Sequence, residues 1–151
     1  NEMAHKKNLT LLKEIDSSLP VALLGDTRRL GQVLNNLVTN AIKYTDSGQI
    51  HVRFHRLEND RWSMQVQDTG VGIAPEAQTA VFDAFWQADN SIARRQGGVG
   101  LGLSIVKRLV AIMEGEIHLD SAAGAGSTFT VILPIKNPPE FELLENTQQE
   151  M

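Results

Sequence analysis

The stretch RLGQVLNNLVTNAIKYT, residues 29–45, contains the clearest helical pattern of the chain. Its apolar residues recur every three or four positions and would form one nearly unbroken face: Leu30, Val33, Leu34, Leu37, Val38, Ala41 and Ile42. Asp26 is a good N-cap for this helix, and the polar turn at residues 46–48 would end it. An amphipathic helix is therefore predicted between these two signals.

A polar stripe runs beside this apolar face. Asn36, Asn40 and Lys43 lie at positions i, i+4 and i+7, which places them on one side of the helix. The stripe can be an ordinary solvated surface. It can also supply an oxygen ligand for a hard cation and donors for phosphate oxygens. Spacing alone leaves both interpretations open.

Alternating apolar residues predict strands on either side of the helix. An edge strand around residues 9–15 precedes it, and two strands at 50–54 and 62–68 follow, joined by a turn at 58–60. A second helix at 101–113 is apolar almost all round and is expected to be buried. Strands around 117–119 and 129–135 come last. This order predicts an α+β fold, a two-layer α/β sandwich whose mixed, mostly antiparallel sheet has its helices on one face.

Composition narrows the function classes. The chain has 151 residues, 42% of them hydrophobic, no cysteine and a net charge of −4. Four glutamates and no basic residue fall in 137–151, so the remainder holds 14 basic and 14 acidic residues. A neutral body argues against nucleic-acid binding. The lack of cysteine excludes disulfides and thiolate sites, and no apolar run approaches the roughly 20 residues of a membrane span.

The segment Asp68-Thr69-Gly70-Val71-Gly72-Ile73 follows the strand at 62–68. Asp68 continues the row of Trp62, Met64 and Val66, so its carboxylate is expected to point to the buried side. Two glycines would let a ligand approach the backbone closely. The segment can be a plain turn, or its carboxylate can accept a hydrogen bond from an exocyclic amine such as that of adenine.

A glycine cluster, Gly97-Gly98-Val99-Gly100-Leu101-Gly102-Leu103, leads into the second predicted helix. Free amides and the positive end of the helix dipole make such a place suitable for anions. It lacks the Gly-Lys-Ser/Thr of a Walker loop, and Leu103 stands where the dinucleotide fingerprint needs glycine. A flexible hinge is the alternative interpretation.

Taken together and in this order, these segments resemble the ATP-binding catalytic domain of sensor histidine kinases, in the GHKL superfamily that includes gyrase and the heat-shock chaperone ATPases. Residues 29–45 resemble the N box, 68–73 the G1 box, 82–85 the F box, 98–103 the G2 box and 124–129 the terminal glycine box. The resemblance spans residues 8–136 and implies the Bergerat-type ATP-binding fold.

The resemblance also implies ATP and Mg²⁺ as ligands and a role for each matching residue. Asn40 would ligate Mg²⁺ with Asn36 beside it, and Asp68 would bind the adenine amine with Thr128 helping through a water. The other implied nucleotide-binding residues are Lys43, Tyr44, Gly70, Gly72, Ile73, Gly98, Gly100, Leu101, Gly102 and Leu103. Arg94 or Arg95, in a lid at 87–98, could reach the γ-phosphate, or both can be solvated loop charges. Phe82 and Phe85 would anchor the lid or belong to the ordinary core.

Two departures from the superfamily pattern refine the expected reaction. Asn36 stands where hydrolytic relatives carry a glutamate that activates water, and a neutral amide cannot act as that base. None of His5, His51, His55 and His118 fits a phosphoacceptor motif. We therefore expect transfer of the γ-phosphoryl group to a histidine outside this chain, as in a protein-histidine kinase. A nucleotide-binding regulatory module and an anti-sigma-type serine kinase are the alternatives.

The expected organisation has three parts. Residues 1–7 would end a preceding helix or linker, 8–136 would form the catalytic domain, and 137–151 would be an acidic linker. The implied partners are a helical dimerisation and phosphoacceptor domain of the same or a partner chain, and a response regulator or receiver domain as in hybrid kinases. The implied location is cytoplasmic, with no direct membrane contact by this part, although the parent protein could be anchored in the inner membrane.

Overall fold

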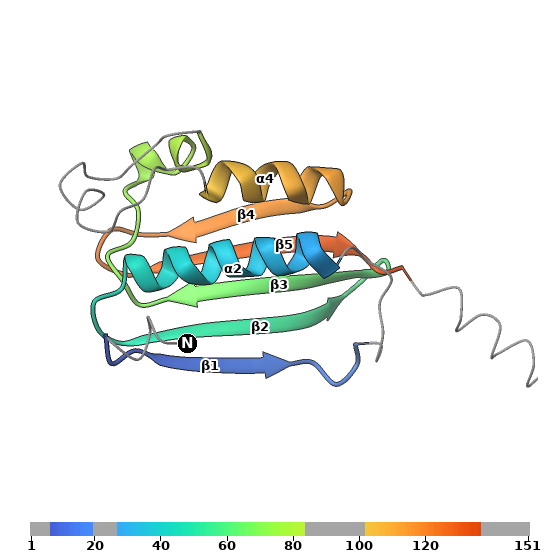
Figure 1. The fold of residues 1–151 in the computed structure, drawn as a ribbon, viewed down its shortest axis with the longest axis horizontal. Helices are drawn as coiled ribbons and strands as arrows, with labels where there is room; N and C mark the ends of the chain where they lie inside the picture. The colour runs from blue at the N-terminus through green and yellow to red at the C-terminus, as the bar shows by residue number, and fades with distance from the viewer. Residues whose placement is uncertain (1–6, 20–26, 84–101, 137–151) are drawn as a thin grey trace, which may run out of the picture.

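The structure, a computed structural model, describes residues 7–19, 27–83 and 102–136. In these ranges the chain forms two layers, a sheet and a pair of helices that cover one of its faces (Figure 1). The elements are β1 (Thr10–Ile15), α2 (Thr27–Lys43), β2 (Gln49–Leu57), β3 (Arg61–Asp68), the short 3-10 turns η1 (Pro75–Ala77) and η2 (Ala80–Phe82), α4 (Gly102–Ile112), β4 (Glu116–Ser121) and β5 (Ser127–Pro134).

The sheet has the strand order β1-β2-β3-β5-β4. β1 pairs with β2 in parallel, and the three other pairs are antiparallel. The parallel pair is joined by a connection that contains α2, as parallel strands require a long crossover. The α+β class and the mixed, mostly antiparallel sheet predicted from the sequence are confirmed.

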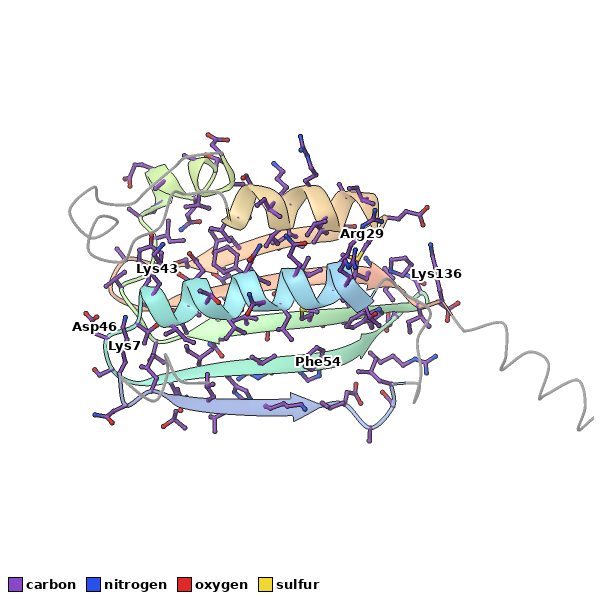
Figure 2. All side chains as sticks on the ribbon, in the orientation of Figure 1. Lys7, Arg29, Lys43, Asp46, Phe54 and Lys136 are labelled. Carbon is purple, nitrogen blue, oxygen red and sulfur yellow. The ribbon has the colours of Figure 1, made fainter. Side chains whose placement is uncertain are left out.

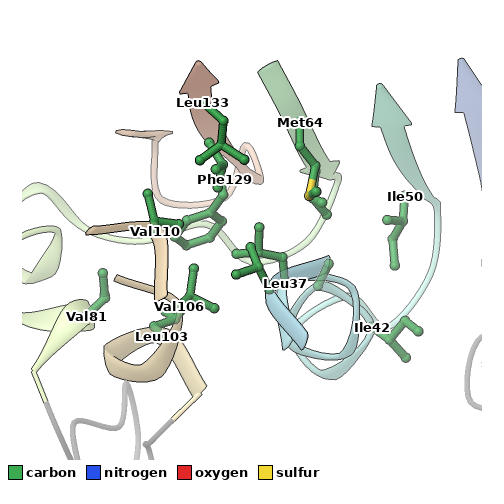
Figure 3. Close-up of a cluster of buried hydrophobic side chains, with 14 of the residues drawn as sticks. Leu37, Ile42, Ile50, Met64, Val81, Leu103, Val106, Val110, Phe129 and Leu133 are labelled. Carbon is green, nitrogen blue, oxygen red and sulfur yellow. The ribbon is translucent and has the colours of Figure 1, made fainter. Parts of the chain in front are cut away.

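The core lies between the sheet and the two helices (Figure 3). On α2, the predicted apolar face buries Val33, Leu37, Ala41 and Ile42. The other large contributions are Leu103, Val106 and Val110 of α4, Met64 and Val66 of β3, and Phe129, Val131 and Leu133 of β5. The helical period of α2 and the alternation along the strands therefore meet in one continuous cluster.

The expectation that the second helix is buried on nearly all sides is wrong. Lys107, Arg108 and Ala111 are exposed on α4, and Ile112 is 50% exposed. In a two-layer sandwich a helix covers the sheet with one face only, so apolar residues can remain on its outer side. Within the described ranges, no helix is long and apolar enough to cross a membrane.

Leu37→Ala should lower the free energy of unfolding by about 2–5 kcal/mol, because Leu37 is 1% exposed and its loss leaves a cavity between α2 and the sheet. Leu12→Ala is the matched control, since Leu12 is 39% exposed on the edge strand β1. Chemical denaturation measures both changes. Equal losses for the two variants would contradict the assigned core.

Candidate nucleotide site

The carboxylate of Asp68 lies at the end of β3, on the face of the sheet that the helices cover. Asp68 pairs with Ile50 of β2 and Ser127 of β5, and only 6% of its surface is exposed. Its Oδ1 accepts a hydrogen bond of 2.9 Å from the Gly70 amide. The inward direction predicted from the alternation along the strand is therefore correct.

Burial raises the pKa of Asp68 above its usual 3.8. The backbone hydrogen bonds from Gly70 and Ser127 and the side chain of Thr45 lower this pKa, but they do not outweigh the effect of burial. A carboxylate in such surroundings has few donors for its lone pairs. It is therefore suited to accept a hydrogen bond from the amine of a ligand.

Thr45, which follows α2, is fully buried beside this carboxylate. Its Oγ1 lies near enough to the carboxylate to act against the rise in the pKa of Asp68, but it makes no hydrogen bond of good geometry with any described residue. Buried hydroxyls normally have a partner, and a ligand or ordered water next to Asp68 would supply one. Thr45 could not be predicted as a site residue, because a lone threonine after a helix carries no signal of burial.

Gly70 and Gly72 fix the loop that follows β3. A Cβ on Gly70 would collide with the carbonyl oxygen of Tyr44, and a Cβ on Gly72 would collide with that of Ala122. Gly72 also has a φ of 70°, in the region that favours glycine. The two glycines thus allow the loop to lie close to the end of α2 and to the turn after β4. Any room they leave for the base of a nucleotide is additional.

The residue of β5 beside Asp68 is Ser127 and not Thr128. Ser127 is opposite Asp68 in the register, whereas Thr128 is opposite Gln67. Because side chains alternate across a strand, Thr128 faces the other side of the sheet from Asp68. Thr128 is therefore not beside the Asp68 carboxylate, and the adjacent place on β5 belongs to Ser127, which is 7% exposed.

A hydrogen-bond network holds the loop against the β4–β5 turn. Ser121 Oγ accepts from the Ile73 amide at 2.8 Å, donates to the Gly126 carbonyl at 2.8 Å and lies 2.9 Å from Ser127 Oγ. The Gln78 side chain donates to the carbonyls of Ile73 and Ser121. Ile73, implied to bind nucleotide, is half-buried here. Ser121 and Gln78 were not predicted, because their partners are distant in sequence.

The polar stripe of α2 borders the start of α4. Asn36, Asn40 and Lys43 are all half-buried, and Asn36 Nδ2 lies 3.5 Å from the carbonyl oxygen of Gly102. Lys43 Nζ is 5.8 Å from the centre of the Tyr44 ring, and burial raises the pKa of that tyrosine. The stripe is therefore not a fully solvated surface.

The first residues of α4 also lie in the described part of the chain. Gly102 is exposed with open space where a Cβ would be, and Leu103 is 8% exposed in the core. The remaining implied phosphate-binding and lid residues, Arg94, Arg95, Gly98, Gly100 and Leu101, lie outside the described residues, as does Phe85. Phe82 packs edge-to-face on Phe129, with 6.1 Å between ring centres.

Histidines and acids form no metal site in the described residues: no group of three or more His, Asp or Glu side chains could hold an ion. His118 lies 2.8 Å from Glu116, and His51 contacts Arg53 and Glu14, as strand histidines do. The side-chain oxygens on α2 that face this site are those of the amides in its polar stripe. Such a set suits a hard cation that is held mainly by the phosphates of a nucleotide.

The comparisons with known proteins identify the family. Residues 25–137 match the family of histidine kinase-, DNA gyrase B- and HSP90-like ATPases. The chain belongs to this family. Sensor protein GacS of Pseudomonas syringae pv. syringae is 45% identical over 141 residues, which cover 91% of this chain and 16% of GacS. Sensor histidine kinase RcsC of Escherichia coli K12 is 45% identical over 130 residues, with 86% and 14% covered.

Solved histidine kinases share the fold. The crystal structure of full-length ShkA in complex with AMPPNP matches with a TM-score of 0.81 and 35% identity, covering 91% of this chain and 28% of that one. The nucleotide-free catalytic domain of ThkA matches with a TM-score of 0.75 and 27% identity, covering 89% and 84%. The chain spans about a sixth of the length of the curated relatives it matches, so it corresponds to one module of those proteins.

The raised pKa of Asp68 makes stability depend on pH. Because the folded chain binds this proton more tightly than the unfolded chain, the ionised carboxylate destabilises the fold increasingly as pH rises from about 3.8 through the raised pKa. The free energy of unfolding of Asp68→Asn should therefore increase relative to wild type between about pH 3 and about pH 7.

Urea unfolding at a series of pH values measures this difference. Asp60→Asn is the control, since it removes an exposed carboxylate from the β2–β3 turn and should give no comparable increase. A difference between Asp68→Asn and wild type that stays constant with pH would contradict the assigned environment of Asp68.

Proposed function

We propose that this chain is the ATP-binding catalytic domain of a sensor histidine kinase, and that it donates the γ-phosphoryl group of ATP to a histidine on an upstream dimerisation domain. The observation that carries the proposal is the buried carboxylate of Asp68, with a buried Thr45 hydroxyl beside it that makes no hydrogen bond of good geometry in the described residues. Adenine offers an amine to the first group, and a water held by the base would satisfy the second.

The base and the phosphates would occupy opposite ends of the site. The base would lie against Asp68 and the loop at 70–73, with Ser127 in the role that was first expected of Thr128. The phosphates would extend toward Lys43 and the amino end of α4, where free amides and the helix dipole favour anions. Gly98, Gly100 and Gly102, the amides of Leu101 and Leu103, and Arg94 or Arg95 remain the proposed phosphate contacts.

Asn40 would hold Mg²⁺ through its amide oxygen, with Asn36 beside it. When bound, the ion would neutralise charge on the phosphates. One amide oxygen from the protein is enough for this role, because Mg²⁺ that is bound together with a nucleotide takes few protein ligands. Tyr44, half-buried next to Lys43, would close the side of the pocket toward the nucleotide.

In the proposed reaction, the bond between the γ-phosphorus and the bridging oxygen of ATP breaks. An imidazole nitrogen of the acceptor forms the new bond to phosphorus, its proton passes to solvent or to a base on the acceptor domain, and ADP leaves with the bridging oxygen. This chain would contribute position and electrostatic stabilisation. Asn36 is uncharged and faces the Gly102 carbonyl, so it cannot activate water. That favours transfer over hydrolysis.

The proposed parent protein supplies the partners. Residues 1–7 would join the dimerisation and phosphoacceptor domain, 8–136 are the catalytic domain, and 137–151 would lead toward a receiver domain or be followed by a separate response regulator. We propose that this domain lies in the cytoplasm. The parent protein can be anchored in the inner membrane. The supports for this proposal are the likeness to the sensor kinases GacS and RcsC and the acidic, unpatterned tail.

Asn40→Ala in the parent protein should reduce autophosphorylation from labelled ATP by roughly a hundredfold or more, because the metal and the phosphates lose a ligand that acts in the transition state. Asn35→Ala is the matched control, since the neighbouring Asn35 is exposed on the other side of α2. Label remaining on the acceptor histidine at the wild-type level in Asn40→Ala would contradict the metal role.

Wild-type protein that binds ATP but never labels the acceptor would instead support a nucleotide-binding regulatory module. Label on a serine would support the serine kinase alternative. Acid lability distinguishes the two products, because phosphohistidine is lost in acid whereas phosphoserine survives.

A further inference from the structure

The side chain of Lys7 caps the carboxyl end of α2. Its Nζ donates to the carbonyl oxygens of Ile42 at 2.9 Å and Lys43 at 3.1 Å. Asp46 Oδ1 lies 4.0 Å away on the far side, and it is 91% exposed, whereas the Lys7 side chain is 26% exposed. Figure 2 shows Lys7, Lys43 and Asp46 together at this end of the helix.

This cap meets a real need of the helix. The last carbonyls of an α-helix lack partners within the helix, and the negative end of its dipole favours a cation there. A lysine that arrives from 35 or more residues away satisfies both requirements. Hydrogen bonds from a charged donor are among the stronger ones in proteins, and those of Lys7 are partly shielded from water.

Residues 42–45, at the end of α2, also border the proposed nucleotide site. The Tyr44 carbonyl accepts a hydrogen bond of 3.2 Å from the Val71 amide, which belongs to the loop after Asp68. The Gly70 backbone lies against that carbonyl and against the Thr45 hydroxyl. A change in the position of residues 42–45 would therefore move both the stripe that ends in Lys43 and the loop that surrounds the proposed adenine site.

We propose that Lys7 is a positioning residue that ties the chain entering the domain to the nucleotide site. Lys7 lies three residues before Thr10, the first residue of β1, where the chain enters the described part of the domain. A shift of the entering chain by about 1 Å would lengthen the two hydrogen bonds from Lys7 beyond hydrogen-bonding distance. The end of α2 would then follow the chain or lose its cap. This inference rests on the proposed function and adds a physical route from the upstream segment to the affinity for ATP.

Lys7→Met tests the route, because it keeps the aliphatic stem and removes the donor. The dissociation constant for Mg·ATP, measured by calorimetry on this chain well below its melting temperature, should rise roughly fivefold. The exchange rate of the Val71 amide, measured by NMR without nucleotide, should rise roughly tenfold as the end of α2 loosens. Lys7→Arg should restore both quantities to within about twofold of wild type, because arginine supplies a charged donor.

Two control variants separate the cap from loss of charge. Lys13→Met removes an exposed lysine from β1, and Asp46→Asn removes the exposed neighbour of Lys7. Both should leave the affinity and the Val71 exchange unchanged. An effect of Asp46→Asn as large as that of Lys7→Met would overturn the backbone cap as the cause.

The outcomes also separate this inference from the proposed function. If wild type binds no ATP, the proposed function fails, while the Val71 exchange still reports whether Lys7 holds the loop. If wild type binds ATP and Lys7→Met lowers only the melting temperature, with affinity and exchange unchanged, then Lys7 is a structural cap alone and the positioning role is overturned.

Discussion

The burial of the Asp68 carboxylate is the constraint on which the site depends. The side chain sits at the end of the central strand β3, between β2 and β5, where water is largely excluded and the pKa is raised. A charge in that place costs stability and is tolerated only with donors around it. The Gly70 amide and the backbone of Ser127 provide part of what it needs. The remaining capacity of the carboxylate to accept hydrogen bonds, together with the poorly satisfied hydroxyl of Thr45, defines a place for a polar ligand.

The helix α2 serves the core and the site with different faces. Leu37 and Ile42 anchor it on the sheet, and Asn36 of its polar stripe approaches the start of α4. Any force that displaces its end therefore acts on packing and on the pocket together. The contacts of Lys7 and Val71 at that end show how closely the entry of the chain, the helix and the loop after β3 are joined.

The periodicity of the sequence predicted the helices and strands well, because these elements form from residues that are near one another in the chain. The 3.6-residue period gave α2, and the alternation along β3 gave the inward direction of Asp68. The pairing of Asp68 with Ser127 could not be predicted that way, since the register between distant strands is set by tertiary structure. The expectation for Thr128 was one residue away from Ser127, and a difference of one residue puts a side chain on the opposite face of the sheet. The exposure of Ile112 escaped prediction because composition does not tell which side of a helix remains uncovered. Thr45 and Lys7 act through partners that only the fold brings near.

Calorimetric titration of the chain with Mg·ATP and Mg·GTP tests the central claim most directly. Adenine carries an amine where guanine carries a carbonyl oxygen, so an ionised Asp68 would attract the first and repel the second. The account predicts that ATP binds and that GTP binds at least about tenfold more weakly. Equal affinity for the two nucleotides, or no complex with ATP, would contradict it.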